Sequence, residues 1–245
     1  MCKGMKMDSY EYTQISDKIW QLEDDDGVCC TLVRGDELAV LIDTGYGRRD
    51  LRGFIESVVS TPYRVINSHG HPDHIGGNAQ FEEVYALKEE WDVIRHFSEK
   101  NREGALREIC LNERLCLGGL HIKVIPLAGH TKGSIGFLVE EEKLLIAGDA
   151  LNEGLWLFNY GALTMRQLYE TILAAMTLDF NNYLCGHSRS VYPKQKLKAH
   201  LRNMETLTLN NCTKQNTIGF ETYTSVYEDA AGRSEIVFTP DRLDG

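Results

Sequence analysis

The stretch SHGHPDHIGG, residues 68–77, decides the interpretation of this chain, because it gathers three of the eight histidines into ten residues. Its four candidate metal ligands are His69, His71, Asp73 and His74. The first two histidines are two residues apart, so on an extended loop their imidazole rings can point the same way. The proline that follows them fixes a turn and can begin a helix, which aims the last two side chains from another direction. Four ligands on one loop could serve two neighbouring ions.

The segments before this loop predict a strand, a helix and a second strand. Residues 38–43 (LAVLID) form an apolar run typical of a buried strand, and a turn at Gly35 and Asp36 predicts that this strand pairs with the one before it. Residues 48–60 carry apolar side chains at helical spacing, and residues 63–68 (YRVINS) run straight into the histidines. Open α/β sheets bind ligands beyond the carboxyl ends of their strands, where this loop is expected to lie.

Three later strands are also predicted to end beside a metal ligand. The sequence reads AGH at His130, AGD at Asp149 and CGH at His187. Glycine lets the backbone turn tightly and leaves room for the ligand to approach an ion. Any one of these histidines could be an ordinary polar residue, but five of the eight histidines stand at predicted strand ends. The whole set therefore favours one shared metal centre.

The remaining pattern alternates apolar strands with helices. Helices are predicted over 88–110, with a break at Gly104, over 165–176 and over 196–210, and a final hairpin within 218–240. The basic stretch 193–202 is interpreted as the solvated face of the last helix. Two rounds of strands followed by helices predict the α/β class, as a four-layer αββα sandwich of two facing sheets with helices outside. At 245 residues, a single domain covering 1–245 is expected.

Composition limits the classes of partner and compartment. The chain is 42% hydrophobic and 25% charged, which is typical of a soluble globular protein. A net charge of −10 disfavours a nucleic-acid partner, and no apolar stretch is long enough to span a bilayer. The first residues lack the apolar core of a signal peptide, and an odd number of cysteines, with Cys29 and Cys30 adjacent, disfavours a disulfide framework. We therefore expect a cytoplasmic protein with reduced thiols; its oligomeric state is left open, with a homodimer as one option.

The ordered motifs HGHPDH, GHTKGS, GDA and GH resemble those of the metallo-β-lactamase-fold hydrolase superfamily. The hallmark of that family is H-x-H-x-D-H followed by a His, an Asp and a His, and every position is matched here; the DTG at Asp43 is also similar. The resemblance implies two divalent ions, with zinc as the first choice and iron or manganese as alternatives. It assigns the first ion to His69, His71 and His130, the second to Asp73, His74 and His187, and a bridging role to Asp149.

The resemblance also implies hydrolysis by a hydroxide held between two ions, which lower the pKa of bound water to about 7. Asp73 and Asp149 are the catalytic candidates, Asp73 as a proton acceptor. No Gly-x-Ser-x-Gly nucleophile elbow is present in the sequence. Cys185 is interpreted as a buried strand residue, and the three histidines outside the motifs as bystanders: His96, His121 and His200.

Other residues near the motifs are weaker candidates for contacts with ligands or substrate. They are Asp43, Thr131, Lys132, Ser134, Asn152, Trp156, Phe158, Tyr160 and Trp91. The aspartate could orient a ligating imidazole through its second nitrogen, or only begin a turn. The hydroxyls could hydrogen-bond near the ligands or only stabilise their turn, and the lysine could meet an anionic substrate or solvent. The aromatic residues could line a pocket, or pack in a core or subunit contact.

The function expected from this resemblance is hydrolysis of a small-molecule ester, thioester or lactone. Three alternatives stay open: a phosphodiesterase acting on nucleotides or RNA, an iron-dependent redox enzyme, and a non-catalytic metal-binding module. The glyoxalase II branch carries an additional C-terminal helical region that helps to bind glutathione, whereas only 58 residues follow His187 here and predict one helix and a hairpin. That difference disfavours glutathione thioesters without excluding thioesters in general. An antibiotic hydrolase is also disfavoured, because no export signal is visible.

Overall fold

The computed structural model of this protein describes residues 5–7, 10–98 and 106–243. Its first sheet has eight strands in sequence order: β1 (Met5–Met7), β2 (Tyr10–Gln14), β3 (Ile19–Glu23), β4 (Cys29–Arg34), β5 (Ala39–Ile42), β6 (Tyr63–Ile66), β7 (Val84–Ala86) and β8 (Leu106–Glu108). Neighbours from β1 to β5 are antiparallel, including the predicted hairpin of β4 and β5. Neighbours from β5 to β8 are parallel, so the carboxyl ends of β5, β6 and β7 meet at one edge.

The second sheet has six strands in the order β15 (Ser188–Pro193), β14 (Asn182–Cys185), β12 (Leu144–Ile146), β11 (Ile135–Val139), β10 (His121–Pro126) and β9 (Arg114–Cys116). A third sheet, which the sequence did not predict as a separate unit, runs in the order β13 (Gly154–Leu157), β18 (Gly232–Phe238), β17 (Phe220–Asp229) and β16 (Thr213–Thr217). The predicted C-terminal hairpin is the antiparallel pair β17 and β18 within it.

Five α-helices occur in the described residues: α1 (Leu51–Val58), α2 (Pro72–Ile75), α3 (Trp91–Phe97), α4 (Met165–Ala175) and α5 (Leu197–Thr206). Helix α1 is the predicted crossover between parallel strands β5 and β6. Its first turn is capped by Asp50, whose carboxylate accepts from the Gly53 N–H. Helix α4 begins with a capping box formed by Thr164 and Gln167. No helix within the described residues is long and apolar enough to span a bilayer.

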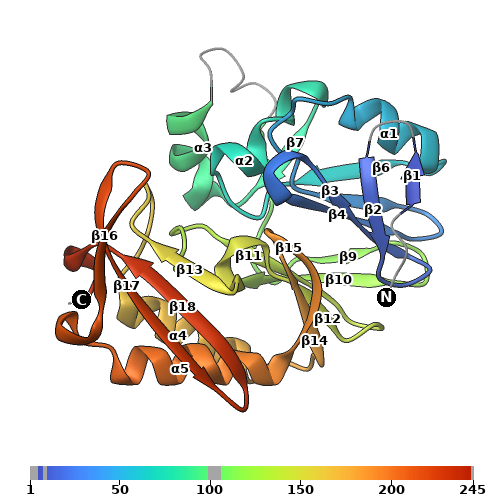
Figure 1. Ribbon diagram of the computed structural model, residues 1–245. Coiled ribbons are helices and arrows are strands. Elements are labelled where there is room, and N and C mark those ends of the chain that lie inside the picture. Colours follow the sequence, from blue (N-terminus) through green and yellow to red (C-terminus); the bar gives the residue numbers. More distant parts are fainter. Residues whose placement is uncertain (1–4, 8–9, 99–105, 244–245) are drawn as a thin grey trace.

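The two large sheets face each other, as predicted. Along β5, Val40 and Ile42 point into the core between the sheets, whereas Leu41 points into the core under α1. From the second sheet, Val124 and Phe137 fill the same inter-sheet core. Figure 1 shows α1 and α3 beyond the first sheet, with α4 and α5 on the opposite side of the molecule. The four-layer αββα prediction is therefore confirmed, with the third sheet packed on α5 as an addition.

The predicted helix over 88–110 is wrong in its second half. A short 3-10 helix (Lys88–Glu90) and α3 cover its beginning, but α3 ends at Phe97 and residues 106–108 form β8. Residues 99–105, which include the predicted break at Gly104, lie outside the described part of the chain. Parallel pairing with β7 overrides the helical spacing there, because it satisfies the backbone and buries Leu106.

The structure corrects two predictions about the last helix and the basic stretch at its beginning. Helix α5 ends at Thr206 rather than continuing to residue 210. The stretch 193–202 is not wholly a solvated face, because Lys196 is buried. Its ammonium group donates to Glu153 Oε1 at 2.9 Å and to the Arg233 carbonyl at 2.9 Å, which ties α5 to the third sheet.

Candidate metal centre

The histidine loop leaves the carboxyl end of β6 and turns into α2. Pro72 is the first residue of α2, and His71 precedes it in an extended conformation, as the sequence predicted. The side chains of His69, His71 and His74 are buried. The loop therefore points its histidines into the protein, toward the edge of the second sheet.

Seven predicted ligands converge there in two groups. In each group the candidate ligand atoms all lie within 4.8 Å of one another: His69, His71 and His130 in the first, Asp73, His74, Asp149 and His187 in the second. The first sheet and its loops supply four of these residues. The other three follow β10, β12 and β14 of the second sheet. The centre is thus assembled only where the two sheets meet.

The first group is a cluster of three imidazoles. The His71 Nδ1 and His130 Nε2 atoms are 2.8 Å apart. The ring of His69 lies 4.8 Å from that of His71 and 4.9 Å from that of His130, measured between centroids. Three imidazole nitrogens facing one small space match the ligand set of a divalent zinc-like ion.

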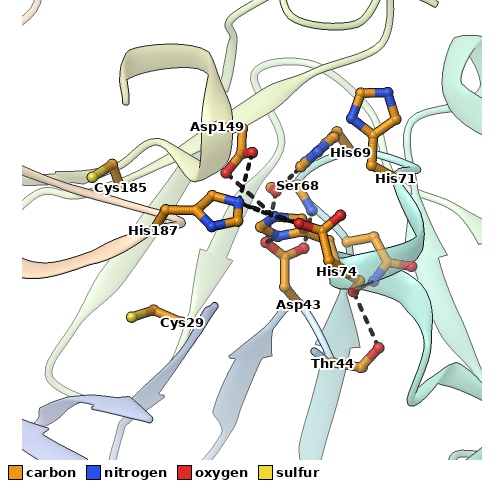
Figure 2. A network of polar contacts seen from close by, with 12 residues as sticks. Cys29, Asp43, Thr44, Ser68, His69, His71, His74, Asp149, Cys185 and His187 are labelled. Carbon is orange, nitrogen blue, oxygen red and sulfur yellow. Dashed lines mark hydrogen bonds and ion pairs between the residues drawn. The ribbon is translucent and has the colours of Figure 1, made fainter. Parts of the chain in front are cut away.

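The second group combines two imidazoles with two carboxylates (Figure 2). Asp149 Oδ2 lies 3.1 Å from His187 Nε2, and Asp149 Oδ1 lies 3.3 Å from His74 Nε2. Asp149 Oδ2 also lies 3.7 Å from His130 Nε2, which belongs to the first group. Asp73 Oδ2 completes the second group at 3.2 Å from His187 Nε2. Asp149 therefore stands between the two groups.

Four of these histidines have their outward-facing nitrogen held by another group. The pairs are His69 Nδ1 with Ser68 Oγ at 3.1 Å, His71 Nε2 with the Tyr160 carbonyl at 3.0 Å, His74 Nδ1 with Asp43 Oδ2 at 3.0 Å, and His130 Nδ1 with the Trp156 carbonyl at 2.9 Å. Such contacts fix the orientation and tautomer of a ligating imidazole. The remaining nitrogen of each ring is left to face the shared space.

Burial and charge divide the histidines in the same way as the geometry. Burial lowers the pKa of His71 to about 3, with the neighbouring His130 imidazole adding to the effect. Burial likewise lowers the pKa of His69 and of His130, so the first group is neutral, which is the ligating form of imidazole. Burial also acts to lower the pKa of His187, but the carboxylates of Asp149 and Asp73 outweigh it and raise the pKa to about 9. The two carboxylates thus create a place for positive charge.

Two buried polar atoms indicate what that positive charge is. Among the described residues, His69 Nε2 has no hydrogen-bond partner, and Asp149 Oδ1 has no hydrogen bond beyond its 3.3 Å contact with His74 Nε2, although both atoms are shielded from solvent. Buried polar atoms normally have a partner. Buried nitrogen and carboxylate donors left in this way fit a divalent cation of the zinc, iron or manganese type.

Comparison with known families decides the assignment. The family model described as "Metallo-beta-lactamase superfamily" matches residues 24–187, which include all seven converging residues. The chain belongs to the metallo-beta-lactamase superfamily.

Named relatives within this superfamily are hydrolases of modest similarity. "Hydroxyacylglutathione hydrolase GloC" of Haemophilus influenzae is 29% identical over 51% of this chain and 67% of its own. "Probable metallo-hydrolase YqgX" of Bacillus subtilis is 29% identical over 49% of this chain and 64% of its own. "Acyl-coenzyme A thioesterase MBLAC2" of Gallus gallus is 27% identical over 50% of this chain and 57% of its own. Matches to the last two thus span less than two thirds of those relatives' length.

Solved structures of the superfamily share the fold. A metallo-beta-lactamase from Pontibacter korlensis is 20% identical, with a TM-score of 0.66 over 81% of this chain and 100% of that one. An archaeal superfamily protein from Sulfolobus tokodaii is 17% identical, with a TM-score of 0.62 over 83% of this chain and 91% of that one. At these identities the likeness concerns the fold.

Glycines beside the superfamily motifs are required by close packing. A Cβ atom on Gly186 would lie 2.2 Å from Asp149 Oδ1 and 2.7 Å from His74 Cε1. A Cβ atom on Gly148 would lie 2.4 Å from Ser68 Oγ, and Gly148 also has a φ of +51°. The expectation that glycine gives the ligands room is confirmed at Gly186. At Gly148 the room is needed for Ser68, and a Cβ atom on Gly129, before His130, would lie 2.5 Å from the Leu168 side chain rather than beside a ligand.

Sequence reasoning did not single out Ser68 or Glu90. Ser68 donates its hydroxyl and its backbone N–H to Asp43, at 2.7 Å each, and so connects that carboxylate to His69. The buried Glu90 carboxylate accepts from the Gly70 N–H and the Gly133 N–H, at 2.8 Å each. It therefore cross-links the loop of the first histidines to the loop that follows His130. A serine beside a ligand was visible in the sequence, but nothing there distinguishes Glu90 from neighbouring surface carboxylates.

A cavity of about 610 Å³ opens onto the candidate metal ligands, five of which line it. Two of the weaker sequence candidates, Asn152 and Trp156, line it, together with Cys185. Cys185 is buried at the end of β14, as predicted, and burial raises the pKa of its thiol to about 12.

The other weaker candidates have different surroundings. Asp43 does orient a histidine, because it accepts from His74. Thr131 hydrogen-bonds to Ser134 within their turn, and Lys132 pairs with the exposed Asp92 at 3.2 Å. The aromatic candidates beyond the cavity lining are placed as follows: Phe158 is buried, Trp91 is the first residue of α3 and packs against a buried apolar cluster that includes Ile94, and the Tyr160 ring stacks on His96.

Proposed function

We propose that this chain is a metal-dependent hydrolase that cleaves a thioester, ester or lactone of a small molecule. The observation that carries the proposal is the convergence of all seven superfamily ligand positions, five of which line one cavity. Two relatives named as a hydroxyacylglutathione hydrolase and an acyl-coenzyme A thioesterase support thioesters as the bond to test first.

Different residues of the chain would hold each of the two ions. When bound, two divalent ions supply a hydroxide at neutral pH and polarise the oxygen of the substrate carbonyl. His69, His71 and His130 would hold one ion, Asp73, His74 and His187 the other, and Asp149 would bridge the two. Zinc is the first metal to test, with iron and manganese as alternatives.

Proton transfer is assigned to Asp73. Its carboxylate lines the cavity and contacts His187, so it faces both the cluster and the substrate space. Burial acts to raise the pKa of Asp73, but the charge on His74 and the hydrogen bond and charge of His187 together outweigh it and lower the pKa. Asp73 is therefore ionised at neutral pH and can accept a proton as water is activated.

The residues that line the cavity favour carbonyl substrates over phosphodiesters. Among the described residues that line it, none is Lys or Arg, whereas phosphate groups are bound mainly by those side chains. A phosphodiesterase, an iron-dependent redox enzyme and a non-catalytic module remain as outcomes of the test below.

The test combines metal analysis with a substrate panel. Purified protein is reconstituted with zinc, iron or manganese, and is assayed on thioester, ester, lactone and phosphodiester substrates. His71→Ala and Asp149→Asn should each remove at least one ion and most of the activity, whereas His96→Ala, at an exposed histidine outside the candidate metal groups, should remove neither. Full metal content in Asp149→Asn would contradict its bridging role. Two bound ions with no turnover on any substrate would favour the non-catalytic module.

A further inference from the structure

The cavity extends beyond the part of the chain that matches the superfamily. That match ends at residue 187, yet Ile218 lines the cavity. Ile218 lies in the turn between β16 and β17 and is 68% exposed. Figure 1 shows this hairpin extending past β13, the strand that carries Trp156. The third sheet therefore adds a wall to a site whose metal ligands all come from elsewhere.

Ring contacts fix this wall in place. The Phe158 ring lies 5.1 Å from the Trp156 ring and 5.5 Å from the Phe220 ring, measured between centroids. Strand β13 pairs with β18, and β18 pairs with β17 over seven residues on each strand. The hairpin is thus joined to the cavity both by its backbone and through three aromatic side chains.

The backbone at Ile218 is unfavourable for the residue it carries. Ile218 has a φ of +43° and Gly219 has a φ of +92°, so both central residues of this two-residue turn are in the left-handed region. Such turns strongly favour Asn-Gly, and a β-branched residue is strained there. Folding alone therefore favours asparagine at this position. An exposed, strained isoleucine that lines a cavity indicates a role in binding.

The rest of the lining indicates what would bind. Trp156 and Ile218 are the large apolar side chains of the lining, and both are partly exposed. The charged lining residues outside the metal cluster are carboxylates: Asp26, which is 3.2 Å from Arg48, and Glu153, which is 2.9 Å from Lys196. This wall can cover an apolar group, but its own residues offer an anion no cationic side chain.

We infer that the β16–β17 hairpin binds an uncharged, apolar substituent on the carbonyl carbon of the substrate, with Ile218 as a specificity-determining residue. The inference rests on the proposed function, because it takes the reacting carbonyl to be at the metal cluster. It assigns the protein a preference for straight or branched apolar acyl groups over short or charged ones.

The experiment measures binding of product-like acids rather than turnover. Zinc-loaded full-length protein is titrated by calorimetry with acetate, butanoate, hexanoate and octanoate. Each methylene added to the acid should lower the dissociation constant about twofold if the wall covers half of its surface. Full burial of a methylene lowers the dissociation constant about fourfold. In Ile218→Asn, octanoate should bind about fivefold more weakly than to the wild type, whereas acetate should bind equally well.

Two controls separate loss of the wall from loss of folding or of metal. Ile218→Asn places the favoured residue in the turn, so its Tm should be equal to or above that of the wild type, with unchanged zinc content. Val226→Asn alters an exposed apolar residue of the same hairpin that does not line the cavity, and should keep the chain-length dependence. Affinity that does not rise with chain length, or that rises equally in Ile218→Asn, would overturn the inference. Absence of turnover on every substrate would instead reject the proposed function, and would leave the binding series interpretable.

Discussion

The buried carboxylate of Glu90 gives a prediction that opposes intuition about hydrogen bonds. Glu90 is 1% exposed and accepts from the N–H groups of Gly70 and Gly133. Burial nevertheless raises its pKa from 4.5 to about 7, so the two hydrogen bonds only partly offset the loss of hydration. Replacing it by glutamine removes the ionisation and keeps the shape of the side chain.

The expected magnitude follows from that pKa. Between pH 4.5 and pH 7 the folded protein binds more protons at Glu90 than the unfolded chain does, so the contribution of Glu90 to the free energy of unfolding falls as pH rises. A difference of roughly 2.5 pKa units corresponds to about 3 kcal/mol. Glu90→Gln lacks this loss. Relative to the wild type, the variant should therefore gain about 3 kcal/mol of stability between pH 4.5 and pH 8.

The assay is urea unfolding of metal-free wild type and Glu90→Gln at several pH values. The contributions of other titrating groups to the free energy of unfolding largely cancel in the difference between the two proteins. The control is Glu89→Gln, at the exposed neighbouring residue, which should show no trend with pH. A difference that stays constant within about 0.5 kcal/mol would refute the reasoning, because it would mean that Glu90 ionises normally. Glutamine offers one acceptor oxygen for two N–H groups, so the same variant should bind metal more weakly, by about tenfold or more.

Further predictions concern metal affinity and can be checked by elemental analysis and competition with a chelator. Asp43→Asn should lower the affinity about 10- to 100-fold, because Asp43 holds both His74 and Ser68; unchanged affinity would show that this contact is dispensable. Gly186→Ala should lose metal, since its Cβ would lie 2.2 Å from Asp149 Oδ1, whereas Gly154→Ala, with its nearest atom at 3.8 Å, should retain it. Stripping the ions should lower the free energy of unfolding, measured by chemical denaturation, by about 2.7 kcal/mol for each bound ion, relative to protein with free metal at 100 times the dissociation constant. Equal stability of the two forms would argue that the cluster does not hold metal in the folded state.

The convergence of the seven candidate ligands could be predicted because each of them stands in a recognisable local pattern. Each ligand follows a strand, and glycine precedes His130, Asp149 and His187 directly, so local patterns identify positions that meet only after folding. The strand, helix and strand around the first loop could be predicted for the same reason. Their apolar spacing is local, and the crossover between parallel strands β5 and β6 follows from it.

Features that depend on distant pairing left no such trace. β13 pairs with β18, although 74 residues separate Leu157 from Gly232 in the chain. No local pattern in either segment indicates this pairing. β8 forms by pairing with β7, which the helical spacing of the segment before it concealed. Glu90 acts on the backbone N–H groups of two loops, and backbone groups are present at every residue apart from proline, so no side-chain pattern marks that contact.

The origin of the ligands explains why the two sheets must pack accurately. His69, His71 and His74 are held by the first sheet, and His130, Asp149 and His187 by the second, so a small sliding of one sheet past the other would change distances across the whole cluster. The inter-sheet core prevents that movement, because Ile66, at the end of β6, and Leu184, near the end of β14, pack in the same cluster of buried side chains. Glu90 adds a polar tie beside the metal ligands. The apolar core thus sets the spacing of the sheets, and the buried carboxylates refine the direction of each ligand within it.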